Sequence, residues 1–266
     1  MKISFIGAGN MTQAFLKGSS TSFFEHEVWI SNRNQAKLDA LVQYPITCTT
    51  NNLLAVDSAD ILILAIKPQQ MFDLLQEIRT NIKADAIIIS LAAGLSIHQL
   101  EQWLCIPVKL IRFMPNTAIA LGIGTIAICH NQNVDVSELS LVKELFKPCG
   151  SLIDIDENQF ELFIAASGSG IAFVYQIMAS YIQVLQELGL DEVQAKLMIM
   201  ETFFAASSMA KINPDFDDLM NRVASKGGTT IEGLSVLRSS QLKHILHETC
   251  LRTIQRSKQL SEELQK

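Results

Sequence analysis

The stretch MKISFIGAGNM, residues 1–11, decides the fold of this chain. Lys2–Ile6 has the pattern of an apolar strand, Gly7-Ala8-Gly9 follows at once, and Met11–Gly18 has helical spacing. In a strand–turn–helix unit, two such glycines permit a tight turn and let a pyrophosphate approach the backbone at the helix N-terminus. Thr12 stands where the Gly-x-Gly-x-x-Gly pattern has its third glycine, so an ordinary tight turn is the alternative. The context favours a dinucleotide site.

Alternating strand and helix patterns continue outward from this stretch. Continuous apolar runs separated by helices are typical of a parallel sheet covered on both faces. The expected strands are Lys2–Ile6, Val28–Ser31, Ile61–Ile66, Ile87–Leu91, Val108–Phe113, Thr125–Ile128 and Ser151–Ile155. The expected helices are Met11–Gly18, Gln35–Gln43, one that begins near Pro68, Ile97–Leu104 and Val136–Phe146.

Only helical patterns follow Asp156. They cover residues 157–188, 191–211, 215–223, 229–238 and 240–264. We therefore expect two domains: an α/β, Rossmann-like parallel-sheet domain over residues 1–155, and an all-α domain over residues 156–266.

Composition narrows the class of protein. The chain has 266 residues, 48% of them hydrophobic, and a net charge of −6 without a run of Lys or Arg, so neither nucleic acid nor an anionic membrane is an expected partner. Five widely spaced cysteines indicate reduced, mostly buried thiols in a cytoplasmic protein. His244 and His247 have no evident third ligand, so we expect no metal site. We also expect no leader peptide before the first strand.

Leu162–Gln186 carries no charged residue and is long enough to span a bilayer. Serines, glutamines and glycines interrupt it, however, and Lys/Arg flanks are missing. We expect a helix that is buried on most sides inside a soluble assembly, and hence an obligate dimer, which can be the unit of a larger ring.

A second cue to the cofactor lies at the end of the second strand, Ile30-Ser31-Asn32-Arg33. A site that prefers NAD usually has an acidic residue here for the ribose 2′-hydroxyl, whereas this chain offers Arg33. An arginine suits a 2′-phosphate, so the sequence predicts NADP(H). The alternative is an arginine that is only solvated.

Two further stretches carry glycines next to helices. In residues 225–232, SKGGTTIE, two glycines precede a helix, and Thr229 and Glu232 have capping-box spacing. Free backbone N–H groups at such a helix start attract an anion, although a plain capped helix is the alternative. In Ser167-Gly168-Ser169-Gly170, small residues inside a helix permit close approach of a ligand or, equally, tight helix packing.

Taken together, these stretches resemble the pyrroline-5-carboxylate reductase family over nearly the whole chain. The matching stretches are FIGAGNM (5–11), ISNR (30–33), LAIKPQ (64–69), SLAAGLS (90–96), RFMPNT (112–117), SGSGIAF (167–173) and SKGGTTIEGL (225–234). The resemblance implies a Rossmann domain, a helical dimerisation domain, and NADPH-dependent reduction of the cyclic imine Δ1-pyrroline-5-carboxylate to L-proline, the last step of proline biosynthesis.

The resemblance also implies roles for individual residues. The pyrophosphate would be bound by Gly7, Gly9, Asn10 and Met11. The 2′-phosphate would be bound by Asn32 and Arg33, and Asn52 would lie near the adenosine ribose. Those on the nicotinamide side would be Ala65, Lys67, Pro68, Met114, Pro115 and Asn116. The substrate carboxylate would meet Ser225, Gly228 and Thr229, and the hydroxyl of Thr230 would meet the ring nitrogen.

Three departures from the family pattern surround this site. Ala118, Ile171 and Lys226 replace prolines, which predicts a looser backbone because proline restricts its own φ and the preceding residue. Two alternatives follow: a reductase of another small cyclic imine, and a nucleotide-binding homologue without turnover.

Overall fold

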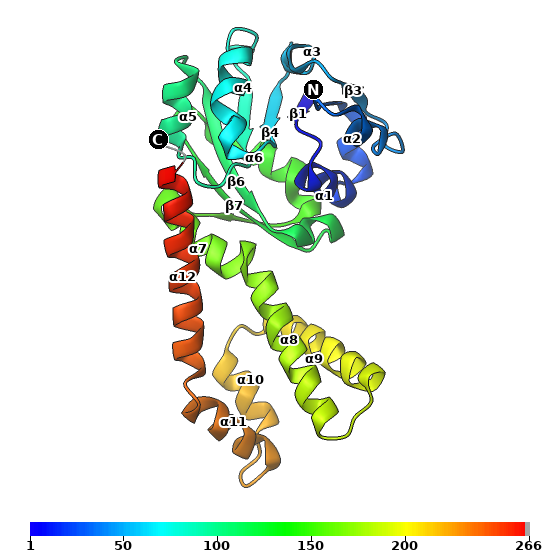
Figure 1. The fold of residues 1–266 in the computed structure, drawn as a ribbon, viewed down its shortest axis with the longest axis vertical. Coiled ribbons are helices and arrows are strands. Elements are labelled where there is room, and N and C mark those ends of the chain that lie inside the picture. Colours follow the sequence, from blue (N-terminus) through cyan, green and yellow to red (C-terminus); the bar gives the residue numbers. More distant parts are fainter. Residues whose placement is uncertain (264–266) are drawn as a thin grey trace. The chain divides into compact units, whose positions relative to one another are not determined.

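The computed structural model describes residues 1–263. It divides into two compact units (Figure 1). The first comprises Met1–Gly168 together with the end of the chain from Thr253, and the second comprises Ser169–Arg252.

The first unit is built on a sheet that has eight strands within the described residues, in the order β3-β2-β1-β4-β5-β6-β7-β8. The strands are β1 (Lys2–Ile6), β2 (Glu27–Ser31), β3 (Thr47–Thr49), β4 (Ile61–Leu64), β5 (Ile87–Ser90), β6 (Lys109–Pro115), β7 (Gly124–His130) and β8 (Gly150–Asp154). Neighbouring strands are parallel except β6 and β7, which are antiparallel. The order reverses beside β1, which is where doubly wound sheets bind their ligands.

Helices cover both faces of this sheet. They are α1 (Asn10–Gly18), α2 (Gln35–Asp39), α3 (Asn52–Val56), α4 (Met71–Ile78), α5 (Ile97–Leu104), α6 (Val136–Phe146) and α7 (Phe160–Phe163). Along β4, Ile61 and Ile63 join the apolar cluster formed with α1 and α6, while Leu62 and Leu64 join the one formed with α3, α4, α5 and α7. Burial on both faces explains why the strands are continuously apolar, each such side chain contributing about 1.5–3 kcal/mol.

The predicted strands and most predicted helices are confirmed, with three differences. The helix expected at Gln35–Gln43 ends at Asp39. The three-residue edge strand β3 and the five-residue helix α3 were not predicted, because elements this short have no readable periodicity. The sheet is not wholly parallel, since only a short 3-10 helix, Thr117–Leu121, joins β6 to β7 and leaves no room for a crossover.

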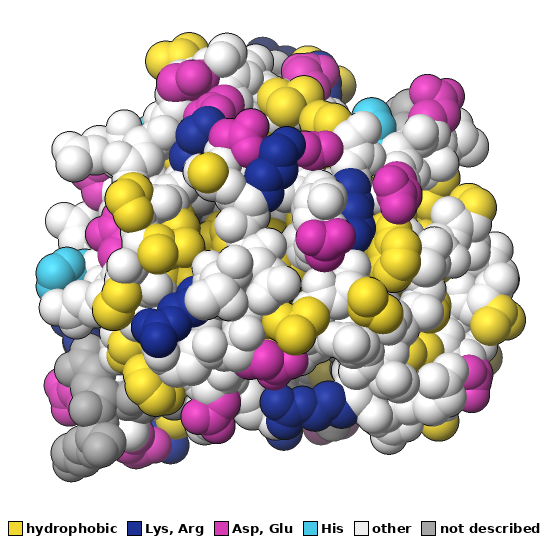
Figure 2. All heavy atoms as spheres, turned by 90° about the horizontal axis from the view of Figure 1, so that it is seen from above, with side chains coloured by type: hydrophobic (Ala, Val, Ile, Leu, Met, Phe, Trp, Pro, Cys, Tyr) yellow, Lys and Arg dark blue, Asp and Glu magenta, His cyan; other side chains and the backbone are white. Residues whose placement is uncertain are grey.

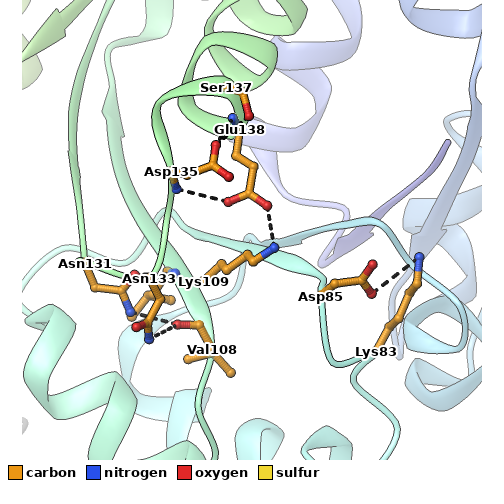
Figure 3. Close-up of polar contacts among 10 residues, drawn as sticks. Lys83, Asp85, Val108, Lys109, Asn131, Asn133, Asp135, Ser137 and Glu138 are labelled. Atoms are coloured by element: carbon orange, nitrogen blue, oxygen red, sulfur yellow. Dashed lines mark hydrogen bonds and ion pairs between the residues drawn. The ribbon is translucent and has the colours of Figure 1, made fainter.

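Helix α6 begins where its sequence predicts because a capping box fixes its start (Figure 3). The Asp135 carboxylate accepts from the Glu138 amide at 2.9 Å, and the Glu138 carboxylate accepts from the Asp135 amide at 3.1 Å. Lys109 of β6 pairs with the same Glu138 carboxylate. These contacts attach the helix to the neighbouring strand, away from the loops that follow β1 and β2.

The five cysteines are all free. Cys129 and Cys149 are buried, and burial raises their pKa values to about 12 and about 11, so both stay protonated thiols. The prediction of mostly buried thiols is wrong for Cys48 and Cys105, which are exposed. Cys48 lies on the edge strand β3, and Cys105 caps α5 in a left-handed conformation with φ 55°.

The second unit is helical, as predicted. Its elements are α8 (Gly170–Glu187), α9 (Glu192–Ile212), α10 (Phe216–Val223), α11 (Thr229–Ser239) and the first half of α12 (Leu242–Glu263). The expected continuous helix over residues 157–188 is interrupted by a π-helical segment, Ile164–Gly168. This segment contains the first half of the Ser-Gly-Ser-Gly motif, and π-helical turns occur frequently at functional sites.

The sheet ends at Asp154, next to the expected domain division at residue 155. The compact units nevertheless divide later, at residue 168. The reason is that Phe160 and Phe163 of α7 are buried in the apolar core beneath the sheet. The chain also returns from residue 253 onward to the first unit.

On the face drawn in Figure 2, basic and acidic side chains are interspersed with apolar and uncharged ones. Nucleic-acid-binding surfaces instead gather Lys and Arg on one side. The mixed pattern on this face agrees with the net charge of −6.

Helices α8 and α9 expose many apolar side chains. The exposed side chains are Val174, Tyr175, Ile177, Tyr181 and Val184 on α8, and Val193, Leu197, Met198, Met200, Phe204, Met209 and Ile212 on α9. The stretch Glu157–Glu187 is long and apolar enough to cross a membrane by length and composition, and 11% of its most apolar window is buried within the chain. The expected burial on most sides is therefore absent from the described single chain, and a covering surface must come from outside it.

We predict that another copy of the chain provides that cover, so that light scattering at low micromolar concentration gives at least twice the 29.5 kDa chain mass. Phe204→Glu places a charge on a side chain that is 70% exposed in the single chain, so it should weaken the subunit contact, shift the mass toward monomer and leave the first unit folded. Val42→Glu, at a 79% exposed position of the first unit, is the matched control. A folded wild-type monomer at this concentration would contradict the prediction.

Candidate functional site

The turn after β1 requires glycine at position 7. Gly7 has φ +112°, and a Cβ there would lie 2.4 Å from the Ala65 carbonyl oxygen. Its amide donates to the Ser31 carbonyl oxygen at 2.8 Å. The turn thus joins the carboxyl ends of β1 and β2 and brings the backbone after β4 close by, which no side chain larger than hydrogen permits.

Helix α1 starts at Asn10 with Gly9 as its N-cap, and no side chain caps it. The amides of Asn10 and Met11 are therefore first-turn donors, which suit an anion. A Cβ built on Gly9 would meet nothing within 4 Å, so open space lies against this backbone. The departure at Thr12 has a structural reason, because its buried hydroxyl donates to the Gly7 carbonyl oxygen at 2.7 Å and braces the turn.

A cleft of about 300 Å³ opens beside this turn. Its lining residues include Gly7, Ser31, Asn32, Arg33, Asn34, Lys37, Asn52, Lys67 and Gln70. Asn32 is held in place, since its Oδ1 accepts from the Ala8 amide at 3.2 Å and its Nδ2 donates to the Asn34 carbonyl oxygen at 3.0 Å. The Arg33 side chain is 72% exposed.

Asn52, at the start of α3, is buried and lines the same cleft. Its Oδ1 accepts from the buried Ser31 hydroxyl at 2.7 Å. Its Nδ2 lies 3.2 and 3.3 Å from the two carboxylate oxygens of Glu77 on α4. Glu77 in turn lies 3.8 Å from Arg33 Nη2. A chain of polar contacts therefore runs from the end of β2 to the exposed arginine.

The residues predicted for the nicotinamide ribose follow β4. Ala65 is fixed by the bond from its amide to the Ile6 carbonyl oxygen, 2.9 Å, and Lys67 lines the cleft. Pro68 instead lines a neighbouring hollow of about 470 Å³. The other residues of that hollow are Gln69, Ala93, Gly94, and Ser257, Leu260 and Glu263 of α12.

Met114 and Pro115, predicted at the nicotinamide, end β6, Asn116 follows directly, and all three are buried. Asn116 Nδ2 donates to the Ser167 hydroxyl at 2.9 Å, which ties β6 to the π-helical segment. Asn116 Oδ1 accepts from the Ala118 amide at 3.1 Å. Proline has no amide hydrogen, so Ala118 adds a bond that the expected proline cannot make, and this loop is held rather than loosened.

The residues predicted for the substrate, Ser225, Gly228, Thr229 and Thr230, belong to the second unit. The Gly228 amide donates to the Ser225 carbonyl oxygen at 2.9 Å across Lys226 and Gly227, which has φ +73°. This is the pattern of a type II turn, whose second position favours proline and accepts other residues.

The expected capping box between Thr229 and Glu232 does not form. The helix α11 begins one residue earlier than that box requires, with Gly228 as N-cap and no side-chain cap. The first-turn amides of α11 consequently remain available as donors. Thr230 is then the second residue of the helix.

Sequence reasoning missed Lys37 and Glu77. Lys37 lies on α2 and lines the cleft. It comes four residues after Arg33, and this closeness to the end of the second strand could have indicated a second cation for the phosphate. No local signal marks Glu77, because it approaches Asn52 and Arg33, two residues of the cleft lining, from the distant helix α4. Arg33 and Lys37 line the cleft, and the Glu77 carboxylate contacts Arg33 and Asn52 of that lining.

The residues present fit a phosphorylated dinucleotide. Three cations, Arg33, Lys37 and Lys67, line the cleft, and an uncapped helix start with open space at Gly9 adjoins it. The helix start suits a pyrophosphate, and the cations suit further phosphate charge.

The fold and this cleft define a Rossmann-type oxidoreductase dependent on a nicotinamide dinucleotide. Comparison with known proteins narrows the class. The chain is 32% identical over 263 residues to pyrroline-5-carboxylate reductase of Aquifex aeolicus, which covers 98% of this chain and 97% of that protein. The chain belongs to the pyrroline-5-carboxylate reductase family.

Family models agree with this assignment in both parts of the chain. The model described as pyrroline-5-carboxylate reductase dimerisation matches residues 157–260, and the one described as NADP oxidoreductase, coenzyme F420-dependent, matches residues 2–94. Pyrroline-5-carboxylate reductase 1 of Bacillus subtilis is 29% identical over 270 residues, covering 100% of this chain and 91% of that protein.

Solved structures are similar over the full length. A pyrroline-5-carboxylate reductase from Coxiella burnetii has TM-score 0.89 and 29% identity, and covers 97% of each chain. The Plasmodium falciparum pyrroline carboxylate reductase, solved with NADP bound, has TM-score 0.84 and 25% identity, and covers 98% of each chain.

The contrast between the two glycines gives a prediction. Gly9→Ala meets open space, so the stability of the protein should fall by no more than about 1 kcal/mol, whereas NADPH affinity should fall at least roughly ten-fold because the methyl group occupies the space of the pyrophosphate. Gly7→Ala should instead lower the melting temperature. Thermal melting and NADPH titration of both variants check this, and unchanged NADPH affinity in Gly9→Ala would place the pyrophosphate elsewhere.

Proposed function

We propose that this protein reduces Δ1-pyrroline-5-carboxylate to L-proline with NADPH, the last step of proline biosynthesis. The cationic cleft beside the Gly7 turn is the observation that carries the proposal, because it fits a phosphorylated dinucleotide at the switch point of the sheet. The names of the full-length relatives supply the substrate.

In this proposal the first unit binds and orients the cofactor. The amides of Asn10 and Met11, with Gly7 and Gly9, meet the pyrophosphate at the start of α1. Asn32 and Arg33, with Lys37 beside them, meet the 2′-phosphate. Asn52 meets the adenosine ribose. A charge-assisted contact of Arg33 with the phosphate contributes about 1.5–3 kcal/mol.

The nicotinamide half lies along the loops after β4 and β6. Ala65, Lys67 and Pro68 meet its ribose, with Lys67 in the cleft and Pro68 in the neighbouring hollow, and Met114, Pro115 and Asn116 meet the ring. When bound, the reduced nicotinamide supplies a hydride to the carbon of the C=N bond. The bond from Asn116 to Ser167 holds the end of β6 in place for that geometry.

The second unit holds the substrate. The uncapped start of α11 offers the Thr229 amide to the carboxylate, together with the Ser225 hydroxyl, and Gly228, whose own amide closes the turn onto Ser225, lets the carboxylate approach the backbone. The Thr230 hydroxyl hydrogen-bonds the ring nitrogen. A protonated imine accepts hydride directly, so the site needs no strong general acid.

The two expected domains have different functions in this proposal. Residues 1–155 bind NADP(H), and residues 156–266 bind the substrate and join two copies into a homodimer, as the match to the dimerisation model supports. The apolar faces of α8 and α9 lie against the partner copy rather than lipid. We further propose a cytoplasmic protein that forms a ring of dimers and binds neither membrane nor nucleic acid.

Activity is tested by following the oxidation of NADPH with pyrroline-5-carboxylate, and the reduction of NADP+ by proline at alkaline pH. A panel of other cyclic imines is the control for substrate. Binding of NADPH without turnover of pyrroline-5-carboxylate or of any panel member would indicate a nucleotide-binding homologue instead.

Arg33 gives a prediction on cofactor choice. Arg33→Ala should weaken NADPH binding about ten- to a hundred-fold and leave NADH almost unchanged, because only NADPH carries the 2′-phosphate. Arg33→Lys keeps the positive charge but loses the forked guanidinium donor. Its NADPH affinity should therefore lie between those of the wild type and Arg33→Ala. Fluorescence titration with both cofactors measures this. Equal weakening of NADPH and NADH would assign Arg33 to the fold.

The substrate loop gives a prediction on turnover. Thr230→Ala should lower kcat/KM for pyrroline-5-carboxylate by the equivalent of roughly 1–3 kcal/mol and hardly change NADPH affinity. Lys226→Pro should keep or raise activity, since proline is favoured at the second position of this turn. If Thr230→Ala matches the parent while Lys226→Pro abolishes activity, the loop does not hold the substrate.

A further inference from the structure

A carboxylate lies beside the predicted 2′-phosphate residues, although no acidic residue follows β2. It belongs to Glu77, in the last turn of α4. Its two oxygens lie 3.2 and 3.3 Å from Asn52 Nδ2, and one of them lies 3.8 Å from Arg33 Nη2. Glu77 therefore contacts both the residue predicted for the adenosine ribose and the residue predicted for the 2′-phosphate.

The two ends of this contact differ in how firmly they are held. Asn52 is 7% exposed, and its Oδ1 accepts from the fully buried Ser31 hydroxyl at 2.7 Å. Asn52 is thus fixed, and its amide nitrogen donates to the Glu77 carboxylate. Arg33, by contrast, is 72% exposed, and an exposed ion pair at 3.8 Å contributes little. The arginine is free to turn toward a phosphate, whereas the Glu77 carboxylate, 37% exposed, has Asn52 Nδ2 as a second contact.

A carboxylate at this place has opposite effects on the two cofactors. It accepts hydrogen bonds from ribose hydroxyls, as the acidic residue after the second strand does in NAD-preferring sites. It repels a 2′-phosphate, which carries the same sign of charge. We propose that Glu77 is a specificity-determining residue of the cofactor site, one that favours NADH and restrains the preference for NADPH conferred by Arg33 and Lys37. This inference rests on the proposed use of a nicotinamide dinucleotide.

The choice between cofactors then follows from a balance of charges in one cleft. Arg33 and Lys37 line the cleft and attract the phosphate, and Glu77, which contacts Arg33 and Asn52 of that lining from α4, opposes them. A unit charge near a phosphate at a partly exposed site changes its binding by a few-fold to about ten-fold, and salt reduces the effect. The chain should therefore bind NADH measurably and prefer NADPH only moderately.

The test is Glu77→Gln, which keeps an oxygen acceptor for Asn52 and removes the charge. Fluorescence titration of the whole protein should show NADPH binding about three- to ten-fold tighter, with NADH unchanged or about two-fold weaker. The gain for NADPH should shrink as salt is raised. In the double variant Arg33→Ala/Glu77→Gln, the effect of the arginine on NADPH should persist, because the glutamate opposes the phosphate independently of the ion pair.

Glu144→Gln is the matched control, since Glu144 is an exposed acid on α6 that pairs only with Lys147 among the described contacts. It makes the same change of net charge and should leave both affinities as they are. An unchanged NADPH-to-NADH affinity ratio in Glu77→Gln, or equal weakening of both cofactors with a lowered melting temperature, would overturn the inference. A wild-type protein that binds neither cofactor would instead overturn the proposed function.

Discussion

The hydrogen bond from the Gly7 amide to the Ser31 carbonyl oxygen, made at a φ of +112°, is the constraint on which the cofactor side of the structure depends. It aligns the ends of β1 and β2. The turn also brings Gly7 so near the backbone after β4 that a Cβ at position 7 would lie 2.4 Å from the Ala65 carbonyl oxygen. Three strand ends therefore meet at one point. Helix α1 begins at Asn10, three residues after Gly7, so its N-terminus lies next to that point.

Polar side chains extend this arrangement along the carboxyl edge of the sheet. Thr12 braces the turn from inside α1, Ser31 and Asn52 join the end of β2 to α3, and Asn116 joins the end of β6 to Ser167. All of these groups are buried or partly buried, and each has a partner within hydrogen-bond distance. A polar side chain that is buried and satisfied has little freedom to rearrange, so the edge of the sheet is organised before a ligand arrives.

The second unit differs from the first in that it has little apolar core of its own. Its helices bury few side chains within the single chain, with Gly170 the buried residue of α8 and Ala195 and Ile199 those of α9. These helices leave many large apolar side chains exposed, and contiguous exposed apolar surface marks an interaction site. The match of this region to a family model for dimerisation explains the excess, because subunit contact supplies the core that one chain lacks.

The sequence by itself determined the strand–turn–helix start, the strands β4, β5 and β6, the helices α5 and α6, and the change to helices after residue 155. Local information suffices for these elements, since apolar runs, helical spacing and glycine turns are read over a few neighbouring residues. Gly7, Asn32 and Arg33 line one cleft because they come just after β1 and β2, whereas Asn52 and Lys67, which line it too, were predicted only from the family resemblance.

Only the tertiary structure decided how distant parts meet. Glu77 reaches Asn52 across 25 residues of sequence, Ser167 reaches Asn116 across 51, and the end of α12 returns to the first unit. None of these contacts leaves a periodic trace in the sequence, because each depends on where whole elements pack and not on the residues adjacent in the chain.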